Sequence, residues 1–154
     1  MVSGAALQKI FKNEQDTCAF AQELAQTLKL GDAVALSGDL GAGKSVFARA
    51  LMRALGVKDE ALPSPTYAII QEYNGQLANG EICKVAHMDW YRLEESEEVE
   101  MLGVREFFEA PWISIVEWPE RALNTFPSTL THITLSYVEG DMNQRKIEIM
   151  HQSS

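Results

Sequence analysis

A glycine-rich stretch that ends in a lysine and a serine has the residue types and spacing that suit phosphate binding. It runs from Gly38 to Ser45 and matches the pattern G-x-x-x-x-G-K-[ST]. Its glycines let successive backbone N–H groups point inward, and a helix that follows adds the positive end of its dipole. Lys44 would place its charge between the β- and γ-phosphates, and the Ser45 hydroxyl suits Mg²⁺ coordination. The pattern predicts nucleotide binding through Asp39, Leu40, Gly41, Ala42, Gly43, Lys44, Ser45 and Val46.

Two carboxylates follow apolar runs and are the candidates for handling the metal and the attacking water. Residues 85–89 form an imperfect apolar run that ends in Asp89, and residues 113–117 form a cleaner one that ends in Glu117. P-loop enzymes need an acidic residue near the metal and a group that orients the nucleophile. Sites of α/β proteins lie at strand ends, where both residues are expected. Either carboxylate could serve the metal, and Glu117 could act instead as a general base.

Three more residues stand close to these candidates in the sequence. Thr66 follows the loop by about twenty residues, where a switch threonine could sense the γ-phosphate and its Mg²⁺. Trp118 is next to Glu117 and could border the site, although most tryptophans of this kind only pack. His87 precedes Asp89 by two residues, but no other His or Cys stands at ligand spacing, so a hydrogen-bonded structural histidine is favoured over a metal ligand.

The elements that would position these residues alternate between strand and helix. We expect a helix from the capping residue Asn13 to Gly31, a buried strand at 33–37, a helix at 46–55 and a strand at 112–116. Residues 94–108 read as a helix broken at Gly103. Two hairpins are expected, one from 66–73 and 82–88 across two Asn-Gly pairs, the other from 132–137 and 146–150. The prediction is an α/β fold: one P-loop NTPase-like domain over residues 1–154, with a mixed central sheet flanked by helices and β-hairpin additions.

Composition narrows the class of protein further. The chain has 154 residues, 46% of them hydrophobic, and 13 Lys and Arg against 22 Asp and Glu give a net charge of −9. This charge excludes a broad basic surface for nucleic acid. Much of it lies between Glu94 and Glu120, where nine Glu accompany one Arg. The two cysteines form no disulfide framework, and without a leader-like or membrane-spanning segment the protein is expected to be cytoplasmic.

Four separated stretches together resemble the bacterial TsaE (YjeE) family. They are residues 38–44, 64–67, 87–93 and 116–120, with the sequences GDLGAGK, SPTY, HMDWYRL and VEWPE. The first is generic to P-loop proteins, but the ordered set is specific to this family. Thr17 also falls on a position that is typically threonine, and the resemblance extends from about residue 13 to residue 149.

The resemblance implies an ATPase needed for forming threonylcarbamoyladenosine (t6A) at position 37 of tRNAs. Such a protein does not transfer the threonylcarbamoyl group; it binds the TsaB–TsaD complex, meets tRNA only through it, and uses ATP to support its turnover. Lys44 and its loop would then bind the phosphates of ATP or ADP. The resemblance also implies the remaining roles: Ser45, Asp89 and Glu117 for Mg²⁺ and water, Thr66 as the switch, and Thr17, Trp118 and Arg145 near the nucleotide.

Two positions depart from the family pattern, and two other functions remain open. Val46 stands where a second hydroxyl residue is common, and Trp90 stands where leucine is usual. The P-loop would equally suit a small-molecule or nucleotide kinase, although such enzymes usually carry an arginine-rich lid, and no arginine cluster follows Lys44. A nucleotide-dependent binding module with negligible hydrolysis is the other alternative.

Overall fold

Apolar runs along the chain build a seven-stranded sheet in the computed structural model, which describes residues 7–39, 41–62 and 70–151. The strands are β1 (Leu7–Phe11), β2 (Ala33–Ser37), β3 (Ile70–Gln76), β4 (Ile82–Asp89), β5 (Trp112–Glu117), β6 (Thr131–Val138) and β7 (Asp141–His151). The helices are α1 (Glu14–Thr27), α2 (Lys44–Ala54) and α3 (Ser96–Met101), and the 3-10 segments are η1 (Val104–Phe108) and η2 (Pro119–Thr125). None of these helices is long and apolar enough to cross a membrane.

The sheet has a parallel centre and antiparallel edges. Its order is β1-β7-β6-β2-β5-β4-β3. Strand β2 pairs in parallel with β5 and β6, and β5 pairs in parallel with β4. All five residues of β2 are buried, as expected for a strand covered on both faces. The carboxyl ends of β2, β4 and β5 therefore meet at one edge of the parallel centre, where α/β proteins place their sites.

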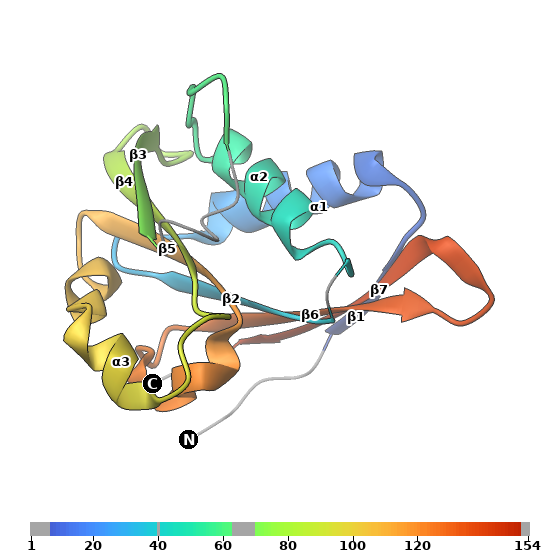
Figure 1. The fold of residues 1–154 in the computed structure, drawn as a ribbon. Coiled ribbons are helices and arrows are strands. Elements are labelled where there is room, and N and C mark those ends of the chain that lie inside the picture. The colour runs from blue at the N-terminus through green and yellow to red at the C-terminus, as the bar shows by residue number, and fades with distance from the viewer. Residues whose placement is uncertain (1–6, 40, 63–69, 152–154) are drawn as a thin grey trace.

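Helices cover both faces of the sheet, as Figure 1 shows. Helices α1 and α2 pack on one face, where Val34 and Leu36 of β2 contribute to the larger core. Ala33 and Ala35 point to the other face, which α3, η1 and η2 cover. Helix α1 begins where predicted, because the Asn13 side chain accepts a hydrogen bond of 3.0 Å from the Asp16 backbone N–H.

The observed elements confirm the predicted fold class and most of its parts. The strand at 33–37, the second hairpin and the helix break at Gly103, whose φ is +69°, occur as expected. The first hairpin also forms, from β3 and β4, and the predicted strand residues 66–69 fall outside the described residues. The Asn74-Gly75 pair was wrongly expected in the loop of the first hairpin. Both residues belong to strand β3, where Gly75 pairs with Cys83 of β4, and the chain turns at Asn79-Gly80 instead. The prediction also missed β1 and η2. Strand β1 lies at the edge of the sheet and buries only Phe11 fully, so it lacks a strong apolar pattern.

Candidate functional site

The glycine-rich loop joins the end of β2 to the start of α2, the arrangement predicted from the sequence. Gly38, Gly41 and Gly43 all have positive φ angles, of +146°, +81° and +103°. A Cβ atom at Gly38 would collide with the carbonyl oxygen of Leu135, so this position requires glycine. Gly43 lies directly before Lys44, the first residue of α2, so the loop's last residues form the positive end of that helix. This geometry can hold an anion.

Lys44 lies inside the loop and not in solvent. Its Nζ donates hydrogen bonds to the carbonyl oxygens of Gly38 and Asp39, the second at 3.1 Å, and lies 4.0 Å from the centroid of the Trp118 ring. Burial lowers the pKa of the ammonium group, while the negative charges of Glu117, Glu120, Asp89 and Asp39 oppose that shift. The charge is thus desolvated but held among acidic groups beside the loop.

Ser45, Glu117 and His87 form a connected network in which Glu117 and His87 are buried and Ser45 is half-buried. The Ser45 hydroxyl donates to Glu117 Oε1 at 3.2 Å, and Glu117 Oε2 lies 2.7 Å from His87 Nε2. Glu117 is 2% exposed and His87 is 1% exposed. Because a carboxylate only accepts hydrogen bonds, His87 carries a proton on Nε2 when Glu117 is ionised. His87 is therefore the hydrogen-bonded histidine expected from the sequence, and its partner is a candidate site residue.

Asp89 stands beside Glu117 on the neighbouring strand, with which it is in register. Its Oδ1 accepts a hydrogen bond of 2.9 Å from the Tyr91 backbone N–H. Burial raises the pKa of Asp89, and the nearby charge of Glu117 adds to the rise, whereas the Tyr91 hydrogen bond opposes it. The two candidate carboxylates thus meet at one edge of the sheet.

Oxygen donors on three elements could hold a divalent cation there. Ser45 supplies a hydroxyl and Asp89 and Glu117 supply carboxylates, the hard ligands that Mg²⁺ prefers. Within the described part of the chain, no three His, Cys, Asp or Glu side chains gather as a metal site of their own. That suits Mg²⁺, which usually binds through one or two carboxylates together with waters and substrate phosphates.

Trp118 covers the loop lysine in a strained backbone conformation. Its φ of +60° is the only positive value among the described non-glycine residues. Its backbone N–H donates to the Leu36 carbonyl at 3.3 Å, and its ring packs on Tyr91 with 4.8 Å between centroids. A bulky residue adopts this region rarely and at an energetic cost. The fold therefore fixes the indole directly over Lys44.

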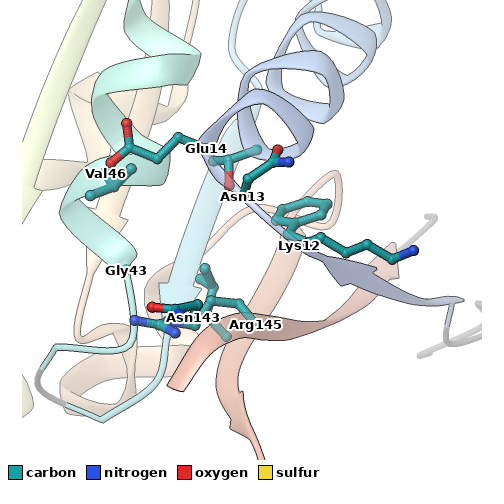
Figure 2. A pocket seen from close by; sticks show the side chains of 10 residues that line it. Lys12, Asn13, Glu14, Gly43, Val46, Asn143 and Arg145 are labelled. Carbon is teal, nitrogen blue, oxygen red and sulfur yellow. The ribbon is translucent and has the colours of Figure 1, made fainter. Parts of the chain in front are cut away.

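A pocket of about 350 Å³ opens next to the loop, between the start of α1, the start of α2 and strand β7 (Figure 2). The structure brings Thr17, Val46 and Arg145 together here, although they are distant in the sequence. Sequence reasoning gave no site role to four polar residues of the lining, because none of them lies in a recognisable motif; they are Lys12, Asn13, Glu14 and Asn143. The predicted contacts of Thr66 and Leu40 fall outside the described residues.

Comparisons with known proteins agree with the motifs. The family model described as "Threonylcarbamoyl adenosine biosynthesis protein TsaE" matches residues 11–147. The chain belongs to the TsaE family. It is 36% identical to the tRNA threonylcarbamoyladenosine biosynthesis protein TsaE of Aquifex aeolicus over 91% of this chain and 92% of that protein. Identity to the protein of the same name in Bacillus subtilis is 35%, over 84% of this chain and 77% of the relative.

A solved structure gives the same result for the fold of this TsaE family member. The crystal structure of YdiB from Bacillus subtilis superposes with a TM-score of 0.78 at 29% sequence identity. The match covers 99% of this chain and 90% of the YdiB chain. The family and the fold class predicted from the sequence are therefore confirmed.

Proposed function

We propose that this chain is a Mg²⁺-dependent ATPase that supports t6A formation in tRNA by acting on the TsaB–TsaD complex. The observation that carries the proposal is the hydrogen bond of 3.2 Å between Ser45 of the P-loop and Glu117 at the end of β5. It joins the predicted metal-binding hydroxyl to the predicted catalytic carboxylate across 72 residues of sequence. Membership of a family named for threonylcarbamoyl adenosine biosynthesis supports the pathway.

The residues of the site have separate tasks in this proposal. Lys44 and the backbone N–H groups of residues 41–45 bind the β- and γ-phosphates and stabilise the charge on the transferred phosphoryl group. Glu117 orients the attacking water, and Ser45 and Asp89 hold the cation. Mg²⁺, when bound, supplies positive charge at the phosphate oxygens. Thr66 acts as the switch that responds to the γ-phosphate.

The pocket beside Gly43 is our proposed place for the nucleoside of ATP or ADP. It adjoins the loop and has room for part of a ligand, since typical small-molecule pockets start at roughly 300 Å³. Thr17, Val46 and Arg145 line it, and Asn143 offers an amide from β7. Trp118 lies on the lysine side of the loop, so its proposed part is beside the phosphates and not beside the base.

The partner is proposed to be a protein because the chain's own charge disfavours direct contact with tRNA. A net charge of −9 repels phosphates. The acidic residues between Glu94 and Glu109 could face a basic patch on the TsaB–TsaD complex. Charge reversal of several of these glutamates should then weaken association, and unchanged association would remove this interface from the proposal.

The test is release of phosphate from ATP by the purified protein, alone and with the TsaB–TsaD complex. We expect slow release alone and faster release with the complex, together with repeated rounds of tRNA modification only when this chain and ATP are present. Fast phosphate release at the same rate with and without the complex would contradict the proposed switch role. Phosphate transfer to a nucleoside, nucleotide or sugar would instead favour a kinase, and full support of modification by a Glu117→Ala protein that cannot hydrolyse ATP would favour a binding module.

A further inference from the structure

The outer side of the P-loop is held by two side chains of the β6–β7 hairpin. Tyr137 Oη donates a hydrogen bond of 2.7 Å to the Gly41 carbonyl oxygen. Arg145 Nε donates one of 3.0 Å to the Ala42 carbonyl oxygen, and its Nη2 lies 3.5 Å from the Gly41 oxygen. Two successive carbonyl groups of the loop therefore have donors on the hairpin.

These contacts determine where the next two backbone N–H groups point. In a trans peptide the C=O and the N–H of the same plane point in opposite directions. When Tyr137 holds the Gly41 carbonyl toward the hairpin, the N–H of Ala42 points away from the hairpin, and it donates to the Asp39 carbonyl at 3.0 Å, which closes a turn within the loop. When Arg145 holds the Ala42 carbonyl, the N–H of Gly43 is directed away from the hairpin in the same way.

The hairpin itself keeps the two donors in place. Tyr137 and Arg145 are paired residues in the β6–β7 register, and the guanidinium carbon of Arg145 lies 4.4 Å from the centroid of the tyrosine ring. Gly41 leaves room for the hydroxyl, because a Cβ atom at that position would lie 2.8 Å from Tyr137 Oη. The glycine of the loop and the tyrosine of the hairpin are thus sterically matched.

We propose that Tyr137 is a positioning residue for phosphate binding: it holds the Gly41 carbonyl outward, which keeps the Ala42 N–H in the loop's own turn with Asp39, and this turn fixes the loop shape that presents the following N–H groups to the β-phosphate. The proposal rests on the proposed function of the P-loop as a nucleotide site. Tyr137 does not touch the phosphate. Its hydroxyl acts through the peptide plane between Gly41 and Ala42, and its ring acts as a support for Arg145.

The test replaces the hydroxyl alone and measures binding separately from stability. Tyr137→Phe keeps the ring over which Arg145 lies, and Tyr73→Phe is the matched control, because Tyr73 Oη makes a hydrogen bond of 2.7 Å to Gln71 on the distant strand β3. Calorimetry with MgADP gives affinity, thermal unfolding gives stability, and amide hydrogen exchange of Ala42 and Gly43 reports on the loop without nucleotide.

A positioning role predicts a specific combination of results. Tyr137→Phe should weaken MgADP binding about two- to tenfold, the range for loss of one hydrogen bond, and should speed exchange at Ala42 and Gly43. Its melting temperature should stay close to that of the wild type, and Tyr73→Phe should leave affinity and loop exchange unchanged. If Tyr137→Phe shows wild-type affinity and wild-type loop exchange, the inference about Tyr137 is wrong, and the proposed function is unaffected.

Two other outcomes would also count against it. If Tyr137→Phe lowers stability and affinity in parallel, and Tyr73→Phe does the same, the hydroxyl serves only the fold. If the wild-type protein binds no MgADP at all, the proposed function fails, and the inference falls with it. The exchange rates of Ala42 and Gly43 would then still show whether Tyr137 orders the loop.

Discussion

Replacement of Glu117 by glutamine and by alanine separates the proposed catalytic role of this residue from its structural one. Both substitutions remove the buried negative charge, so any cost of burying that charge cancels when the two variants are compared. Glutamine keeps the shape: its carbonyl oxygen can accept from His87 Nε2, and its amide can donate to the Ser45 oxygen. Alanine leaves His87 and Ser45 without these hydrogen bonds in a site where Glu117 is only 2% exposed.

The structure gives the expected size of the difference. Leaving a buried polar group unsatisfied costs about 1–3 kcal/mol, so Glu117→Ala should be about 2–3 kcal/mol less stable than Glu117→Gln. For a chain of this size each kcal/mol corresponds to about 2–4 °C in Tm, which places the two variants about 4–12 °C apart. Both variants should lose at least about a hundredfold in ATP hydrolysis, the lower range for a general base.

The assays are thermal unfolding and steady-state phosphate release, with Glu109→Gln as the control because Glu109 is exposed and lies beside Gly31, at the opposite end of β2 from the loop. Glu109→Gln should match the wild type in both. If Glu117→Gln hydrolyses ATP within twofold of the wild type, the catalytic assignment is wrong. Equal Tm values for the glutamine and alanine variants would show that the hydrogen bonds to His87 and Ser45 contribute nothing measurable.

Three further perturbations test other residues, two of them in the site. Lys44→Ala should weaken MgADP binding by about ten- to a hundredfold, the worth of a charged hydrogen bond, and calorimetry that finds wild-type affinity would reject the phosphate site. His87→Ala should lower Tm, since it leaves the buried Glu117 without this hydrogen bond, whereas His87→Gln should recover part of the loss by donating to Glu117. Burial lowers the pKa of His132 below 6.5, and the charge of Glu120 opposes this shift. The folded state therefore binds fewer protons at this residue than the unfolded state does. The stability that His132 contributes is present above pH 6.5 and is lost as the pH falls through the folded pKa. The free energy of unfolding, measured in urea at pH 5 and pH 8, should therefore depend less on pH for His132→Gln than for the wild type. An equal pH dependence in the two proteins would contradict the lowered pKa of His132.

Local sequence predicted those parts of the fold that local physics determines. The apolar run of β2 between two glycines, the Asn13 cap and the loop pattern each carry their own signal, and each occurs as predicted. The placement of Asp89 and Glu117 at one edge followed from a general rule of α/β sheets. The strand β1 could not be predicted in this way, because it is stabilised by pairing with β7 at the other end of the chain and has little apolar pattern of its own.

The site's long-range contacts were beyond the sequence for the same reason. Tyr137 belongs to no motif, and its hydroxyl meets the Gly41 carbonyl across 96 residues of sequence. Nothing in the residues around it signals this role, since a tyrosine in a strand usually only packs. His87 was considered, but its partner could be named only once β4 and β5 were known to be neighbours in register.

The site is built so that ligand binding must exchange existing hydrogen bonds. Lys44 donates to the loop's own carbonyl oxygens, and Ser45 donates to Glu117. If the proposed substrate binds, the phosphates and the cation would replace these partners, and an exchange of one hydrogen bond for another gains little free energy by itself. The gain must come from charge, because a phosphate is a stronger acceptor for an ammonium group than a carbonyl oxygen is. Freed from Ser45, Glu117 would keep its contact with His87 and turn one oxygen toward water, so the same exchange that binds the nucleotide would also prepare the carboxylate for hydrolysis.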